Sequence, residues 1–254
     1  MDELIRKAAG ELAVAKHVIA LTGAGISVES GIAPFRGPGG IWEKIDPLEY
    51  AHIDAFRSDP AKVWDVLIRG MKEVIDQAQP NDAHRGLARL EELGILKTVI
   101  TQNVDGLHQA AGSSDVIEFH GNFAWQSCLD CGRRRPTRTV ALDRLPPRCD
   151  CGGILRPDCI FFGEQIPIRH LERSQRLARQ CDVILVVGTS AMVQPAASLP
   201  VDAKHAGARV IEINTEPTPL TRGVSDYLIA GGAGAVLQAI VAEMERKNSI
   251  GRVR

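Results

Sequence analysis

The chain has 254 residues, of which 44% are hydrophobic and 24% are charged, and its formal net charge is −1. This is the composition of an ordinary globular protein, and it provides no global basic field for nucleic acid or anionic membranes. No apolar run approaches the roughly 20 residues of a membrane span, and mixed charges from residue 2 onward lack the order of a signal peptide. We therefore expect a cytoplasmic protein with reduced thiols.

Short apolar runs rich in β-branched residues alternate with helical patterns along most of the chain. Because these runs show no polar–apolar alternation, they predict strands covered on both faces, as in a parallel sheet. The strand-then-helix order predicts an α/β fold with a doubly wound sheet. Predicted strands cover 17–22, 97–101, 116–119, 159–162, 183–187, 209–213 and 226–229, and predicted helices cover 2–15, 60–78, 82–93, 170–180, 195–206 and 233–247.

The first predicted strand runs into a glycine-rich loop, TGAGISVESGIAPFRG at 22–37. Gly23 and Gly25 permit close backbone approach to a pyrophosphate. The third glycine of a dinucleotide-binding fingerprint is replaced by Val28, and a lone Gly-x-Gly also fits a plain strand-to-helix turn. The loop continues into 35–60, a stretch rich in glycine, proline and aromatic residues that is long enough to be functional.

Other predicted strands also end in polar residues, at the edge of an α/β sheet where ligands bind. Asn103 and Asp105 follow one strand and His120 follows the next, while 188–190 and 212–216 follow two later strands. Histidine is suited to proton transfer near neutral pH. Taken singly, His120 fits a structural role and Asp105 fits a helix cap. Together, these strand ends predict convergence on one ligand.

Four clustered cysteines interrupt the α/β order within 124–158. Cys128-x-x-Cys131 and Cys149-x-Cys151 are separated by 132–148, a spacing typical of a zinc ribbon. Four thiolates leave no open position on the metal, so the predicted zinc is structural. The alternative is four unrelated core cysteines. The arginines at 133–135 lack interleaved aromatic residues, so no specific nucleic-acid binding is predicted.

Occurring together and in order, these motifs resemble the sirtuin family of NAD-dependent protein deacylases. The resemblance covers about residues 10 to 245 and implies a Rossmann-like domain with a small zinc module. The implied parts are an NAD-binding domain over 1–34, 81–120 and 159–254, a cofactor loop with a helical insertion over 35–80, and a zinc-binding module over 121–158. The motifs that carry it are GAGISVESGIAPFRG, TQNVDGLH, FHG, Cys128-x-x-Cys131, FFGE, GTS and INTEPTP.

The resemblance also implies roles for single residues. His120 is the implied general base, and Asn103 and Asp105 hold the nicotinamide ribose. The residues implied to contact NAD are Gly23, Ala24, Gly25, Ile26, Glu29, Phe35, Arg36, Trp42, Gln102, Asn103, Val104, Asp105, Gly188, Thr189, Ser190, Asn214, Thr215, Glu216 and Ala233. Those implied to contact the acylated lysine of a protein or peptide are Phe35, His120, Ile160, Phe162, Gly163, Val193, Leu67 and Gly70. The implied zinc ligands are Cys128, Cys131, Cys149 and Cys151.

The implied reaction consumes NAD and gives nicotinamide, O-acyl-ADP-ribose and free lysine. Members that prefer succinyl or malonyl lysine carry a tyrosine and an arginine where Leu67 and Gly70 stand here, so acetyl or another neutral acyl group is expected. Long aliphatic acyl groups remain an alternative. Three other functions remain open: protein mono-ADP-ribosyl transfer, NAD-dependent oxidoreduction, and a zinc-ribbon binding module without activity.

Overall fold

The computed structural model describes residues 1–35 and 39–251, with side chains up to Arg246. Its main element is a six-stranded sheet in the order β3-β2-β1-β7-β8-β9, in which every neighbouring pair is parallel. The predicted doubly wound α/β fold is thus confirmed. The strands are β1 Val18–Thr22, β2 Leu96–Thr101, β3 Val116–Glu118, β7 Val183–Val187, β8 Arg209–Asn214 and β9 Tyr227–Ala230.

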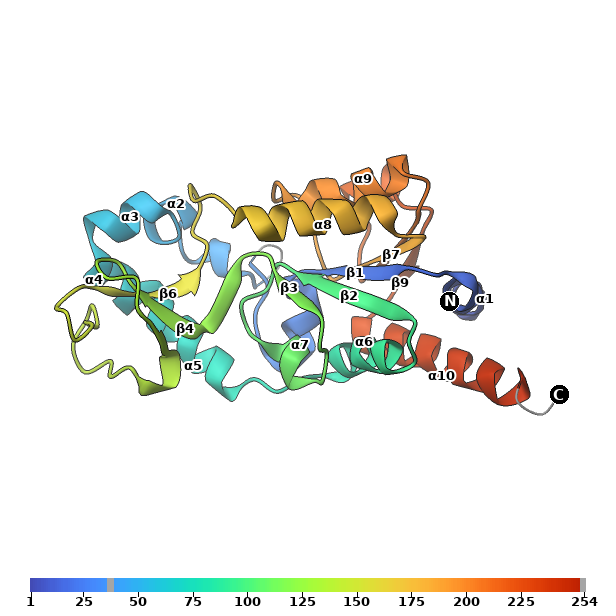
Figure 1. Cartoon of the computed structure of the whole chain (residues 1–254), viewed down its shortest axis with the longest axis horizontal. Helices are drawn as coiled ribbons and strands as arrows, with labels where there is room; N and C mark the ends of the chain where they lie inside the picture. Colours follow the sequence, from blue (N-terminus) through green and yellow to red (C-terminus); the bar gives the residue numbers. More distant parts are fainter. Residues whose placement is uncertain (36–38, 252–254) are drawn as a thin grey trace.

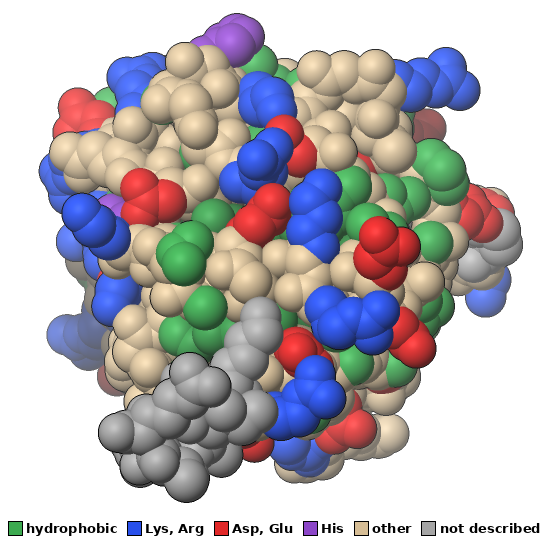
Figure 2. All heavy atoms as spheres, turned by 90° about the vertical axis from the view of Figure 1, so that its right-hand side faces the viewer, with side chains coloured by type: hydrophobic (Ala, Val, Ile, Leu, Met, Phe, Trp, Pro, Cys, Tyr) green, Lys and Arg blue, Asp and Glu red, His purple; other side chains and the backbone are tan. Residues whose placement is uncertain are grey.

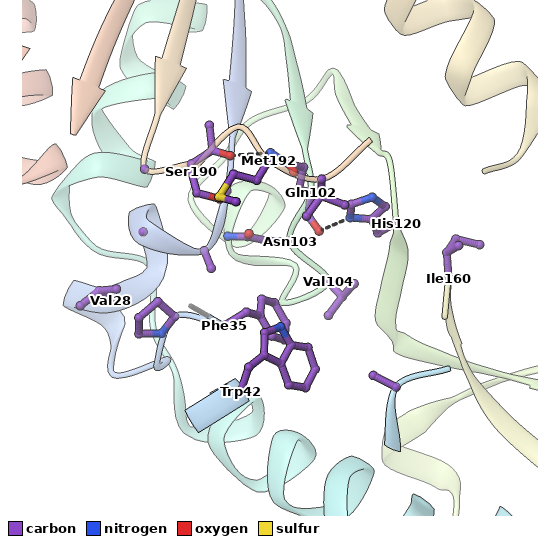
Figure 3. A pocket seen from close by; sticks show the side chains of 18 of the residues that line it. Val28, Phe35, Trp42, Gln102, Asn103, Val104, His120, Ile160, Ser190 and Met192 are labelled. Atoms are coloured by element: carbon purple, nitrogen blue, oxygen red, sulfur yellow. Dashed lines mark hydrogen bonds between the residues drawn. The ribbon is translucent and has the colours of Figure 1, made fainter. Parts of the chain in front are cut away.

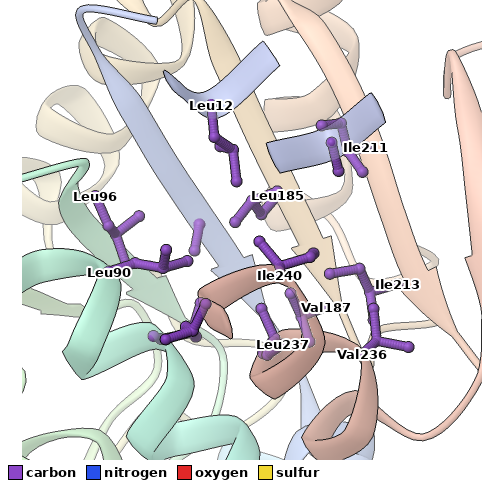
Figure 4. Packing of buried hydrophobic residues seen from close by; sticks show 14 of the residues in the cluster. Leu12, Leu90, Leu96, Leu185, Val187, Ile211, Ile213, Val236, Leu237 and Ile240 are labelled. Carbon is purple, nitrogen blue, oxygen red and sulfur yellow. The ribbon is translucent and has the colours of Figure 1, made fainter. Parts of the chain in front are cut away.

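Helices cover both faces of this sheet (Figure 1). All residues of β1 and β7 are buried, which explains why their sequences show no alternation. One face packs against α1 (Asp2–Val14), α6 (Asp82–Glu92) and α10 (Ala233–Gly251), as Figure 4 shows for Leu12, Leu90 and Leu237. The other face packs against α8 (Ile168–Gln180) and α9 (Leu199–His205).

A smaller lobe lies at one end of the large sheet, at the left of Figure 1. It contains the antiparallel strands β4 (Gly121–Cys128), β5 (Arg134–Pro136) and β6 (Leu155–Cys159) in the order β5-β4-β6. The strand predicted at 159–162 is therefore wrong, because β6 ends at Cys159 and joins the small sheet. The segment that follows forms only an isolated bridge between Phe162 and His52.

Short helices of the predicted insertion complete this lobe. They are α2 (Pro47–Tyr50), α3 (Ile53–Ser58), α4 (Pro60–Val63) and α5 (Arg69–Gln77). A further short helix, α7 (Leu107–Ala110), is not part of this lobe and lies below the large sheet in Figure 1. The helix predicted at 60–78 exists but contains a π-helical turn over Trp64–Ile68. The indole N–H of buried Trp64 donates to the Leu155 carbonyl at 3.0 Å, which ties the insertion to β6.

Charges are mixed at the end of the molecule where the two termini lie. Figure 2 shows this face, on which Lys and Arg side chains are interspersed with Asp and Glu. Arg89 of α6, for example, pairs with Glu245 of α10 at 2.8 Å. In the described part of the chain, no helix has the length and apolar character that crossing a bilayer requires.

Candidate active site

A cavity of about 810 Å³ opens at the carboxyl edge of the large sheet and extends to the small lobe. The strand order places β1 beside β7, while β2 and β8 continue in opposite directions from this pair. This is the topological switch point at which ligands of open α/β sheets bind. The cavity therefore has a polar end on the sheet edge and a second end among the helices of the insertion.

Two glycines let the loops after β1 and β7 cross in contact. A Cβ on Gly25 would lie 2.7 Å from the Gly188 carbonyl oxygen, and a Cβ on Gly188 would lie 2.3 Å from the Ile26 nitrogen. Gly188 also has φ +58°, which favours glycine. The Gly25 N–H donates to the Gly188 carbonyl at 2.7 Å and the Gly23 N–H to the Val187 carbonyl at 3.1 Å. These two amides are therefore used within the protein and do not face a ligand.

Side-chain amides connect the strand ends along the polar end of the cavity. Gln102 Nε2 donates to Thr189 Oγ1 at 2.9 Å, and Asn214 Nδ2 donates to the Thr189 carbonyl at 3.1 Å. The Glu29 carboxylate accepts the Gly234 N–H in the first turn of α10 at 3.3 Å. A carboxylate at a helix N-terminus is favoured by the helix dipole, so Glu29 fixes the start of α10 beside the cavity.

Ser27 connects the two polar residues after β2, and sequence reasoning did not identify it. Its buried hydroxyl donates to Asp105 Oδ2 at 2.7 Å and accepts from Asn103 Nδ2 at 3.0 Å. Asp105 also accepts the Leu107 N–H at 3.0 Å, but the N-cap position of α7 is Gly106, so Asp105 is not the helix cap considered as an alternative. Asn103 borders the cavity, whereas Asp105 lies behind it. Ser27 therefore connects Asn103, which borders the cavity, to the carboxylate of Asp105, which does not.

Two buried histidines lie behind this polar cluster. His84 Nε2 lies 3.4 Å from Ser27 Oγ, and burial lowers the pKa of His84 to about 4 against the raising effect of Asp105. Burial, followed by the proximity of His84, lowers the pKa of His108 to about 3. Both rings are therefore neutral near pH 7 and add no positive charge to this end of the cavity. Nothing in the sequence pattern indicated that His84 reaches this cluster.

His120 lies on the cavity wall between the polar end and the small lobe (Figure 3). Its Nδ1 lies 3.0 Å from the Gln102 carbonyl oxygen, which can only accept, so Nδ1 carries the hydrogen. The neutral ring then has its lone pair on Nε2. Burial lowers the pKa of His120 below its usual value, although the Gln102 carbonyl acts in the opposite direction. His120 is thus a neutral base in the physiological range.

Aromatic rings flank the middle of the cavity. Phe35 stacks on Trp42 with ring centroids 5.1 Å apart, and Trp42 lies 6.3 Å from Phe162. Figure 3 shows the first two rings together below Asn103 and Val104. The neighbouring Arg36, predicted to contact NAD, lies outside the described residues. The aromatic group therefore joins the glycine-rich loop to the segment after β6.

The second end of the cavity is apolar. Leu67 borders it, as do Ile68 and Met71, which sequence reasoning did not assign. Gly70 is exposed and does not border the cavity. Met71 follows Leu67 by four residues and lies on the same helical face, whereas Gly70 faces solvent. Further apolar lining comes from Ala51, Val104, Phe123, Pro157 and Phe161.

The segment that carries three of the predicted lysine contacts, Ile160, Phe162 and Gly163, is itself anchored. Both backbone groups of Phe162 are used, because its N–H donates to the Ala51 carbonyl and its carbonyl accepts the Ile53 N–H, each at 2.9 Å. The guanidinium of Arg156 pairs with both oxygens of Glu164, at 2.6 and 2.7 Å, and Glu164 borders the cavity. This bidentate pair holds the loop after β6 and neutralises the Glu164 charge.

The four predicted metal ligands are brought together in the small lobe. Their sulfur atoms lie within 4.8 Å of one another, with Cys128–Cys151 at 3.5 Å and Cys131–Cys149 at 3.8 Å. A tetrahedron with zinc–sulfur bonds of ~2.3 Å has edges of about 3.8 Å, so the donor set fits zinc. The site lies outside the cavity, in agreement with a structural metal.

Most of the other predicted contact residues border the same cavity, although their contacts with a ligand stay predictions. Ile26 is an exception, since it is buried at 1% exposure in the core beneath the loop. The predicted residues that border the cavity are Gly23, Ala24, Gly25, Glu29, Phe35, Trp42, Leu67, Gln102, Asn103, Val104, His120, Ile160, Phe162, Gly163, Gly188, Thr189, Ser190, Val193, Asn214, Thr215, Glu216 and Ala233.

Comparisons with known proteins place this geometry in context. A family model described as "Sir2 family" matches residues 23–195. The chain is 48% identical over 241 residues to NAD-dependent protein deacylase 2 of Pyrobaculum aerophilum, covering 93% of this chain and 94% of the relative.

Solved structures agree over nearly the whole length. The structure of a Sir2 homolog–NAD complex has a TM-score of 0.88 at 45% identity and covers 95% of this chain and 94% of that one. A structure of Sir2 with a p53 peptide and NAD⁺ has a TM-score of 0.87 at 33% identity and covers 95% of this chain and 99% of that one.

Proposed function

The chain belongs to the Sir2 family, and from this premise we propose that it is an NAD-dependent protein lysine deacylase. The observation that carries the proposal is that a single cavity joins a polar sheet edge, the His120 base and an apolar chamber. The polar end suits the phosphates and riboses of NAD. The apolar end suits the acyl group of a modified lysine in a protein or peptide.

The residue roles follow from this assignment. NAD supplies an anomeric carbon that accepts the acyl oxygen while nicotinamide departs with the bonding electron pair. Asn103, fixed through Ser27 to Asp105, orients the nicotinamide ribose for this cleavage. The rings of Phe35 and Trp42 exclude water from the reacting carbon. His120 Nε2 then removes a proton from a ribose hydroxyl, whose oxygen attacks the carbon of the acyl group. The lysine nitrogen departs with a proton, and one water molecule completes the O-acyl-ADP-ribose product.

The lining favours neutral acyl groups, and we propose acetyl as the principal one. Among the described residues that border the cavity there is neither lysine nor arginine, so a succinyl carboxylate would be buried without a counter-charge. Leu67, Ile68 and Met71 also leave an apolar surface against which longer aliphatic chains can pack. We further propose that zinc held by the four cysteines stabilises the small lobe, that the protein is cytoplasmic, and that it binds no specific nucleic acid.

The test is incubation of the pure protein with NAD and peptides carrying acetyl-, butyryl-, myristoyl- or succinyl-lysine. Chromatography of nicotinamide and mass spectrometry of the peptide are expected to show release in equal amounts, with the succinyl peptide the poorest substrate. The unacylated peptide is the control. Nicotinamide release that does not depend on the acyl group, or reduction of NAD detected by absorbance, would overturn the proposal.

A further inference from the structure

Glu212 is a buried carboxylate that the reaction does not use. It lies on β8, two residues before the strand ends at Asn214, and its side chain is 0% exposed. Burying a carboxylate costs several kcal/mol unless hydrogen bonds or a cation replace its hydration. The polar groups after β8 were predicted to face a ligand, but Glu212 points into the protein and needs another explanation.

Three hydroxyl groups surround this carboxylate. Thr218 Oγ1 donates to Glu212 Oε1 at 2.5 Å, while Thr221 Oγ1 and Ser225 Oγ donate to Oε2 at 2.6 and 3.0 Å. All three belong to the segment that follows β8 and leads to β9. The carboxylate therefore connects one strand to three points on a single loop.

The direction of these bonds is fixed by the backbone. Thr218 Oγ1 accepts the Leu220 N–H at 3.1 Å, and Thr221 Oγ1 accepts the Thr218 N–H at 2.9 Å. Each hydroxyl has one hydrogen, which is therefore directed at Glu212. The two carboxylate oxygens at position 212 supply the acceptors that these hydroxyl donors need.

The loop held in this way forms one wall of the cavity. Residues 214–219 all border it, including Thr218, which contacts Glu212 directly. Glu212 itself does not border the cavity. Its influence on a ligand must therefore pass through the position of this wall.

We propose that Glu212 is a positioning residue for NAD, which holds the loop 215–219 in the shape that the adenosine half of NAD requires. The inference rests on the proposed function, because that function assigns the polar end to NAD. The carboxylate touches neither NAD nor the acyl-lysine. Its loss is expected to weaken NAD binding and to leave the chemical step and the acyl end unaffected.

The direct test is Glu212→Gln, which keeps the shape of the side chain but replaces one carboxylate oxygen by an amide nitrogen that cannot accept a hydroxyl hydrogen. Calorimetry with ADP-ribose is expected to show a roughly tenfold higher Kd, and the KM for NAD is expected to rise equally. The kcat at saturating NAD and the KM for the acetylated peptide should stay within about twofold of the wild type.

The matched control is Asp226→Asn. Asp226 accepts the Val210 N–H at 2.9 Å and pairs with Arg209 at 2.6 Å, so it holds the other end of the same strand, away from the cavity. This variant is expected to lower the Tm without changing the Kd for ADP-ribose. An equal rise of Kd in both variants, or an unchanged Kd in Glu212→Gln, would overturn the inference.

A second pair of variants decides the question if Glu212→Gln does not fold. Thr221→Val removes one donor and is expected to raise the Kd by about threefold, whereas Thr221→Ser keeps the hydroxyl and should restore wild-type affinity. An equal Kd in both would contradict the inference. Since ADP-ribose binding needs no turnover, a wild-type protein that binds ADP-ribose but releases no nicotinamide would refute the proposed function and leave this test intact.

Discussion

The two ends of the cavity are built from different kinds of structure. The NAD end uses loops that follow parallel strands, and it stands on a sheet packed on both faces by helices. The acyl end uses side chains from the insertion and the small lobe, whose apolar cluster is smaller than either cluster of the large sheet. Beside the metal site, the cluster of described buried residues comprises Cys128, Cys149 and Leu155. The first end therefore has the larger apolar core, whereas the strands beside the cysteines at the second end have little apolar core of their own and depend on zinc.

The largest effect is expected where the two ends meet. His120→Ala removes the base and should lower kcat by about 10²- to 10⁴-fold. ADP-ribose affinity should stay within about twofold, because the polar end is built by other residues. Steady-state kinetics and calorimetry measure the two quantities.

His170→Ala is the matched control for that variant. His170 lies on α8, and its Nδ1, like that of His120, contacts a backbone carbonyl, here that of Glu118 at 3.1 Å, but the residue does not border the cavity. Near-normal turnover is expected from it. If His170→Ala lost as much activity as His120→Ala, the assignment of the base would be untenable.

Removal of zinc should impair the acyl end of the cavity much more than the NAD end. Cys131→Ser is expected to lose the metal and to lower the rate of deacylation, though by less than His120→Ala does, since β4, β5 and β6 then hold the acyl end less firmly. ADP-ribose binding should persist with a loss of less than about tenfold. Hydrogen exchange should show deprotection concentrated in 121–158, with Cys181→Ser, whose thiol is buried against the large sheet, as the control. Full protection of 121–158 in the metal-free protein would contradict the account.

A larger side chain at position 67 should change the preference of the acyl end among acyl groups without affecting the NAD end. Leu67→Phe fills part of the chamber and is expected to lower kcat/KM for a myristoyl peptide about tenfold more than for an acetyl peptide. Gly70→Ala is the control, because a Cβ there meets nothing within 4 Å and the residue is exposed. A change of acyl preference in Gly70→Ala would show that the lining has been assigned wrongly.

The smallest expected effect is that of pH on the base. Because burial lowers the pKa of His120, its neutral form persists below the usual value of 6.5. An unshifted histidine would lose about threefold in its basic form between pH 7 and pH 6, so kcat/KM should fall by less than that. A steeper fall would mean that a base with a higher pKa limits the reaction.

The sequence predicted the NAD end far better than the acyl end, for a physical reason. Polar residues after β-branched runs identify strand ends, and parallel strands bring those ends to one edge. His120 and Asn103 were found in this way, and the four cysteines were found separately by their zinc-ribbon spacing. Ser27 and His84 were missed because buried polar contacts between distant segments leave no periodic signal.

At the acyl end Met71, not Gly70, borders the cavity, because the position of the helix against the small lobe decides which side chains face it. The strand expected at 159–162 failed for a related reason. Its apolar residues line the cavity and the small-lobe core, and they do not belong to the large sheet. Local pattern therefore predicted elements, but it could not predict which distant elements they would meet.

The account depends on the acyl oxygen and the anomeric carbon of NAD meeting in this cavity. The most direct measurement is mass spectrometry of the nucleotide products after one turnover with acetylated peptide. We predict an ADP-ribose carrying the acetyl group, equal in amount to the deacetylated peptide. Free acetate beside intact NAD, or ADP-ribose attached to protein, would contradict the central claim.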